Sequence, residues 1–127
     1  MAERLISTGD YEGALKENEK IVGLFPLDSP GDSAVFNMGL IWINSGNPKK
    51  NYAKALGSFQ RIPNDYPRSA LAQEARIWIG VIKELIWYEG KLRKLEVTVN
   101  DLENRLNALK EIDIGIEEKK REDFQVK

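Results

Sequence analysis

The feature that most constrains this chain is the regular spacing of apolar residues in its second half. From Trp78 to Leu109 these residues follow one another at intervals of three and four, and the segment 69–113 contains no proline. Such spacing is typical of the apolar seam of a coiled-coil helix. The positions are Trp78, Val81, Leu85, Tyr88, Leu92, Leu95, Val99, Leu102, Leu106 and Leu109.

The predicted helix is too long for the rest of the chain to cover. Residues 68–113 would span on the order of 65 Å at roughly 1.5 Å per residue. We therefore expect the first part to dock on the preceding helices, and the segment Leu92–Leu109 to pair with another helix. Leucine at both kinds of seam position, with Val99 at one, does not fix the number or direction of the strands. We favour a homodimer.

Residues 1–67 predict two helical hairpins. In the first, Gly9 ends one helix and Asp10 caps the next, which runs to Phe25-Pro26. In the second, Asp32 or Ser33 caps a helix that closes at Gly46. Asn51 then caps a fourth helix that ends around residues 63–67. The predicted fold is therefore all-α, with the hairpins followed by the long helix and a charged, solvated tail over residues 114–127.

The composition excludes several functional classes. The chain of 127 residues has no cysteine and no histidine, which removes thiol nucleophiles, zinc sites of those ligands and histidine-based catalytic pairs. Its 19 basic and 20 acidic residues give no overall positive field for nucleic acid. No apolar run approaches the roughly 20 residues of a membrane span. We expect no enzyme activity, no cofactor and no metal.

The hairpins have the spacing of a known repeat. Small residues let the paired helices approach closely, large residues fill the gap between hairpins, and a proline ends the second helix. This pattern resembles the tetratricopeptide repeat, which implies an alpha-alpha superhelix. Residues 48–51 lengthen the second turn, and Asn18 stands where the repeat usually has an aromatic residue. The matching positions are Gly9, Tyr11, Ala14, Gly39, Trp42, Gly46, Tyr52, Ala55, Phe59, Pro67 and Trp78.

Two further resemblances concern the cell envelope. The segment from Phe59 to Gly80 is similar to repeats of bacterial outer-membrane assembly lipoproteins of the BamD-like family. The segment from Lys94 to Lys119 is similar to the end of QseG-type envelope lipoproteins, which are associated with a sensor kinase. These resemblances imply a periplasmic location and envelope partners, although a cytoplasmic location stays open. Because residues 1–8 read as half a helix, we expect a parent protein with a preceding segment, which could carry a signal or lipid anchor.

The remaining candidate sites have alternative interpretations. We assign Trp42 and Trp78 to packing, whereas Trp87 lies off the seam and is either covered by the second hairpin or exposed as a partner anchor. Lys49 and Lys50 are interpreted as solubilising loop residues, and the alternative is that they contact a phosphate or a carboxylate.

The flanks of the seam carry charge. Glu96 and Arg105 lie there and are expected to form salt bridges between helices. The sequence as a whole predicts a non-enzymatic scaffold or adaptor protein that self-associates. The alternative is a periplasmic regulator of a two-component sensor kinase.

Overall fold

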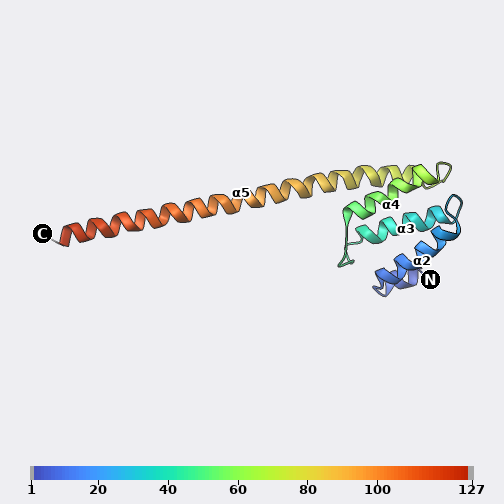
Figure 1. Cartoon of the computed structure of the whole chain (residues 1–127), viewed down its shortest axis with the longest axis horizontal. Helices are drawn as coiled ribbons and strands as arrows, with labels where there is room; N and C mark the ends of the chain where they lie inside the picture. The colour runs from blue at the N-terminus through green and yellow to red at the C-terminus, as the bar shows by residue number, and fades with distance from the viewer. Residues whose placement is uncertain (1, 126–127) are drawn as a thin grey trace. The chain divides into compact units, whose positions relative to one another are not determined.

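The computed structural model describes residues 2–125, and all of the regular structure in that range is helical (Figure 1). This confirms the predicted all-α fold of short helices followed by a long C-terminal helix. The chain divides into two units, Met1–Trp87 (unit 1) and Tyr88–Lys127 (unit 2), which we describe separately. The helices are α1 (Ala2–Ser7), α2 (Tyr11–Leu24), α3 (Gly31–Ile43), α4 (Tyr52–Asp65) and α5 (Ala72–Gln125).

The short helices of unit 1 begin and end where local chemistry dictates. Gly9 has a φ of +83°, a left-handed conformation that suits glycine and lets α1 turn directly into α2. The Asp10 carboxylate then accepts a hydrogen bond from the backbone N–H of Gly13 at 2.9 Å. At α4 the side chain of Asn51 accepts from the N–H of Lys54 at 3.0 Å. Both predicted caps therefore satisfy a free N–H of the first helical turn.

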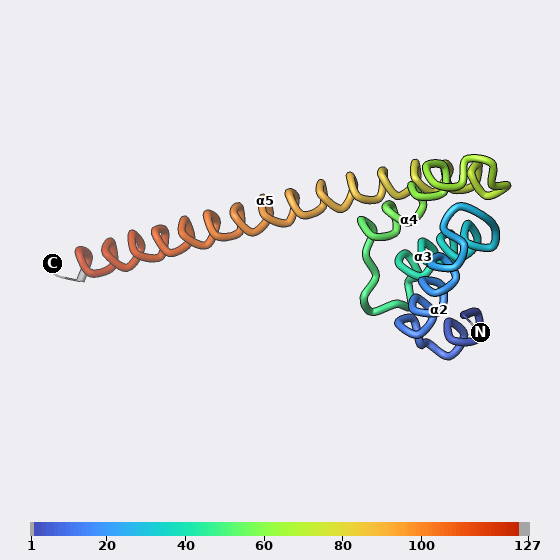
Figure 2. Tube along the Cα trace, turned by 45° about the vertical axis from the view of Figure 1, so that its right-hand side comes forward, coloured from blue at the N-terminus to red at the C-terminus, as the bar shows by residue number. Residues whose placement is uncertain are grey.

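The core of unit 1 is centred on Phe59 of α4. Figure 2 shows α2, α3, α4 and the start of α5 lying side by side in this unit. The Phe59 ring meets Phe36 of α3 edge to face at 5.2 Å between centroids, and it stacks on Trp78 of α5 at 5.7 Å. A Cβ placed on Gly39 would lie 2.6 Å from Cζ of Phe59. The glycine thus lets α3 and α4 approach closely through the aromatic ring.

Neither Asp32 nor Ser33 caps α3 as predicted. The helix begins at Gly31 after Pro30, and no side chain caps it. The Asp32 carboxylate instead accepts hydrogen bonds from the N–H of Ser33 at 2.8 Å and from the hydroxyl of Ser69 at 2.5 Å. The Asp32 carboxylate bonds to the α4–α5 turn, because Ser69 lies beside it in the folded unit.

Unit 1 contains an internal repeat with an offset of 41 positions. Asp10 and Tyr11 at the start of α2 correspond to Asn51 and Tyr52 at the start of α4. The same offset relates other pairs of similar residues along the two hairpins. At the ends of α2 and α4, the backbone of Phe25 (φ −130°, ψ 66°) nearly equals that of Tyr66 (φ −128°, ψ 60°). The further pairs are Ala14 with Ala55, Leu15 with Leu56, Ile21 with Ile62, and Pro26 with Pro67.

The long helix extends beyond the predicted end near Asp113. In the structure α5 continues to Gln125, so the predicted tail is helical over most of its length. Gly115 is the weakest helix former in the segment 114–125, which contains no proline and is rich in glutamate, lysine and arginine. The described side chains of this segment are exposed, as expected for a solvated charged run.

We expect Tyr66→Phe to remove part of the alkaline sensitivity of unit 1 and to cost about 1 kcal/mol below pH 9. The Tyr66 hydroxyl donates to the carbonyl of Phe25 at 2.8 Å, and burial raises the pKa of the phenol. A raised folded-state pKa means that this stabilisation is present below the unfolded value of about 10 and is lost as the pH rises further. Urea unfolding at pH 8 and pH 11 should show a smaller pH effect for the variant.

Candidate interaction surface

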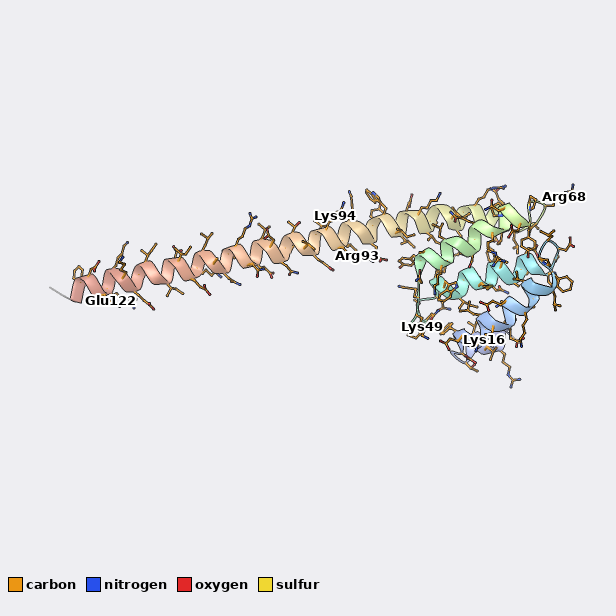
Figure 3. All side chains as sticks on the ribbon, viewed as in Figure 1. Lys16, Lys49, Arg68, Arg93, Lys94 and Glu122 are labelled. Carbon is orange, nitrogen blue, oxygen red and sulfur yellow. The ribbon has the colours of Figure 1, made fainter. Side chains whose placement is uncertain are left out.

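The seam of unit 2 is an unbroken row of exposed apolar side chains. It consists of the six residues predicted from the sequence, and each exposes at least half of its surface within the chain. Their exposed fractions run from 50% for Val99 to 60% for Leu92, Leu95 and Leu109. Figure 3 shows side chains projecting from all sides of α5 in this unit. The seam residues are Leu92, Leu95, Val99, Leu102, Leu106 and Leu109.

The seam is hollowed at its start. A shallow, open groove there is lined by Leu92, Leu95, Glu96, Val99 and Asn100. Side chains at seam positions leave spaces of this kind between successive turns, and a facing helix fills them with its own side chains. The surface therefore has the chemistry of a helix-binding face.

The charged residues beside the seam make contacts within α5. Arg105 pairs with Asp101 at 3.2 Å, and Arg93 pairs with Glu89, each over one helical turn. To form the predicted salt bridge between helices, Arg105 would have to give up its exposed pairing with Asp101 in the same helix. Such exposed pairs stabilise a helix by only a few tenths of a kcal/mol, so the exchange is inexpensive.

In unit 1 the predicted seam is not the face by which α5 docks. Ala75 and Ile82 are fully buried, whereas the seam residues Val81 and Leu85 expose 42% and 38% of their surfaces. Trp78 belongs both to the predicted seam and to the docking face, because it is half-buried and stacks on Phe59. The docking face is displaced around the helix from the seam, since small residues such as Ala75 allow α5 to approach the core.

The predicted repeat residues fall into three groups: buried core residues, half-buried residues at the edge of the core, and exposed residues in turns. Ala14, Ala55, Phe59 and Gly39 are buried. Tyr11, Trp42 and Tyr52 are half-buried, and the ammonium group of Lys54 lies 4.5 Å from the Trp42 ring. The turn residues Gly9, Gly46 and Pro67 are exposed, because their role is to change the direction of the chain.

Three other residues considered in the sequence analysis make contacts within unit 1. Lys49 pairs with Glu12 of α2, and this hydrogen bond and charge lower the pKa of the Glu12 carboxyl. Lys50 lies 5.1 Å from the Tyr52 ring. Asn18 is buried, and its side-chain amide donates a hydrogen bond to the carbonyl of Ala14 at 2.9 Å. This bond gives the buried polar group a partner. Phe59 occupies the corresponding position in the second hairpin.

Trp87 exposes 54% of its surface at the end of unit 1. The sequence left open whether the second hairpin covers Trp87 or leaves it exposed. The hairpins do not enclose its side chain. On α5 in unit 1, Ile77 and Gly80 form an exposed apolar face together with the predicted seam residue Val81, and the sequence predicts no site at Ile77 or Gly80. The 41-position offset was the signal that could have revealed it.

Comparison with known proteins adds no identity to these observations. No family model, no curated protein and no solved structure matches the chain. Within residues 2–125, no helix combines the length and the apolar character required to cross a membrane.

Proposed function

We propose that this chain is a non-enzymatic scaffold that self-associates through the seam Leu92–Leu109, most simply as a dimer. The observation that carries the proposal is the row of six apolar side chains, all at least half exposed, at strict coiled-coil spacing. Single exposed leucines are ordinary on protein surfaces, but a contiguous apolar row marks an interaction site.

The energetics of the seam favour pairing. Complete burial of a leucine or valine side chain stabilises a protein by about 1.5–3 kcal/mol relative to exposure. With half or more of each of the twelve side chains exposed on two copies, the gross gain is on the order of 10–20 kcal/mol before the cost of association is subtracted. This gain supports an association that depends on concentration.

The flanking charges contribute little to a pair of identical helices. In a parallel, in-register dimer, Lys91 would lie near Glu96 of the other copy, which is favourable. Arg105 would lie near Lys110 of the other copy, which is unfavourable. These contributions oppose each other, so apolar contacts dominate the self-association that we propose.

We expect sedimentation equilibrium to give a mass that rises with concentration from the 14.5 kDa of one chain to a multiple of it. The midpoint should fall in the micromolar range for a net gain of about 8 kcal/mol. A single mass of 14.5 kDa up to millimolar concentration would refute self-association.

The second candidate function is regulation of a membrane sensor kinase, whose helices would occupy the same seam. The like charges of Arg105 and Lys110 favour it, because a different helix could place acidic residues opposite them. The resemblance to envelope lipoproteins supports a periplasmic site of action for either function. Capture of a kinase from solubilised envelope, lost in a variant with a charged seam, would support this candidate over self-association.

A further inference from the structure

The third copy of the internal repeat in unit 1 lacks its second helix. By the 41-position offset, α3 corresponds to the start of α5, and α4 would correspond to a helix after it. Such a helix would require a turn near Lys83–Leu85. Instead α5 continues without interruption to Gln125.

The residues buried in both helices establish the correspondence. Ala34 and Ile41 of α3 expose 2% and 1% of their surfaces, and their counterparts Ala75 and Ile82 of α5 expose none. The two pairs stand at the same spacing, and both helices follow turns of the same backbone geometry at Phe25 and Tyr66. The start of α5 therefore occupies the same structural position in its repeat as α3 does in the preceding one.

A second set of corresponding residues is covered in α3 and exposed in α5. Gly39 is buried and Phe36 is half-buried, and both contact the Phe59 ring of α4. Their counterparts Gly80 and Ile77 are exposed, with Ile77 at 59%. We call Ile77, Gly80 and Val81 the Gly80 face. On α3 the equivalent face binds α4, whereas on α5 it is open.

Gly80 corresponds to Gly39 by the same offset of 41 positions. Glycine inside a helix is destabilising relative to alanine. At Gly39 the Phe59 ring occupies the space that a side chain would need, with 2.6 Å between a Cβ and the ring. At Gly80 nothing lies within 4 Å of a Cβ. The same holds at Gly57 and Gly90, so the open space at Gly80 points to a ring-binding position only through its correspondence to Gly39, where the Phe59 ring lies.

The charges around the Gly80 face specify what would bind there. Lys83 stands at the position of Trp42, whose ring lies under Lys54 of α4. Arg76 stands at the position of Val35, and Glu84 stands at that of Ile43. A helix bound as α4 is bound on α3 would therefore meet a lysine where α4 meets an indole ring. An acidic residue there would pair with Lys83.

We propose that the Gly80 face binds an amphipathic helix of a partner protein, oriented antiparallel to α5. The bound helix places an aromatic side chain over Gly80, as Phe59 is placed over Gly39. Five residues before the aromatic residue it carries an acidic side chain close to Lys83, as Lys54 precedes Phe59 in α4. This surface lies wholly within unit 1. Val81 belongs to the same apolar row of α5 as the seam residues, whereas Ile77 and Gly80 lie off that row.

The test uses a synthetic peptide of residues 51–67 in which Lys54 is replaced by glutamate. Fluorescence anisotropy should show saturable binding of the labelled peptide to the full chain. The affinity should be at least tenfold lower for the unmodified peptide, which places Lys54 against Lys83, and for a Phe59→Ala peptide.

Two chain variants localise the binding. Gly80→Leu fills the ring position, and its Cβ would lie more than 4 Å from any other residue, so its thermal unfolding should match or exceed that of the unmodified chain, and peptide binding should be lost. Gly90→Leu is the matched control, because Gly90 also lies in α5 with nothing within 4 Å of a Cβ. It should bind the peptide normally. Ile77→Glu serves as a second disrupting variant.

Three results would overturn the proposal. Absence of peptide binding at millimolar concentration would show that the face does not accept such a helix. Equal binding to the Gly80→Leu variant would show that the peptide replaces α4 in the core instead. A Gly80→Leu chain whose own mass falls to that of a monomer would identify the occupant as a second copy of the chain.

Discussion

Phe59→Ala is expected to lower the free energy of unfolding of unit 1 by about 3–5 kcal/mol, enough to unfold it at moderate temperature. The ring exposes none of its surface, contacts Phe36 and Trp78, and closes the space above Gly39. Its removal leaves a cavity between α3, α4 and α5. This cavity could close only if the helix backbones moved. Thermal unfolding followed by near-ultraviolet circular dichroism would measure the loss.

Phe124→Ala is the matched control, because this phenylalanine exposes 85% of its surface and its truncation should change stability little. The contact between Phe59 and Gly39 can be examined in the same background. Gly39→Ala should cost about 1–3 kcal/mol when the ring is present, since its Cβ would overlap the ring. The cost should shrink in the Phe59→Ala chain. Equal costs in the two backgrounds would contradict the packing described for the core of unit 1.

Leu95→Asp combined with Leu102→Asp is expected to convert the associated chain fully to monomer. Each substitution places a carboxylate opposite an apolar or like-charged side chain in the paired helices, and burial of an unpaired charge costs several kcal/mol. Unit 1 should remain folded, since both residues lie outside it. Light scattering would report the mass, and near-ultraviolet circular dichroism of the core tryptophans would report the fold of unit 1.

The control for this variant adds the same charge to the other side of the helix. Asn104→Asp combined with Asn107→Asp changes two exposed residues off the seam, and the mass should stay that of the associated chain. If both double variants became monomeric, charge alone would explain the effect. If neither changed the mass, the seam would not be the association surface.

Much of the fold followed from local sequence signals. Gly9, Asp10 and Asn51 determine helix ends through backbone conformation and capping, which depend on a few adjacent residues. The seam also follows from local spacing, because alternation of three and four residues places side chains on one face of any helix. These features were therefore predictable from the sequence.

Other features depend on contacts between distant residues. Asp32 was predicted as a helix cap, but Ser69 captures its carboxylate from 37 positions away. The docking of α5 through Ala75 and Ile82 depends on the shape of the core around Phe59, which the spacing of α5 does not contain. The extension to Gln125 contradicts the predicted tail, because the residues of this charged run favour helix even though their side chains lie in solvent.

The internal repeat that points to the Gly80 face is present in the sequence, but the structure is needed to interpret it. The offset of 41 positions relates Gly39 to Gly80 in the printed sequence. Only the contact between Phe59 and Gly39 shows that one of these glycines receives a ring and the other does not.

The most direct test of the proposed self-association is amide hydrogen exchange of the chain at low and high micromolar concentration. An unpaired helix exchanges its amides rapidly, whereas a paired one protects them. The account predicts that protection rises with concentration in the segment 92–109, and that exchange in the core of unit 1 stays unchanged. Exchange of the segment 92–109 that is identical at both concentrations, together with a constant mass, would contradict the proposal that the seam is where this chain associates.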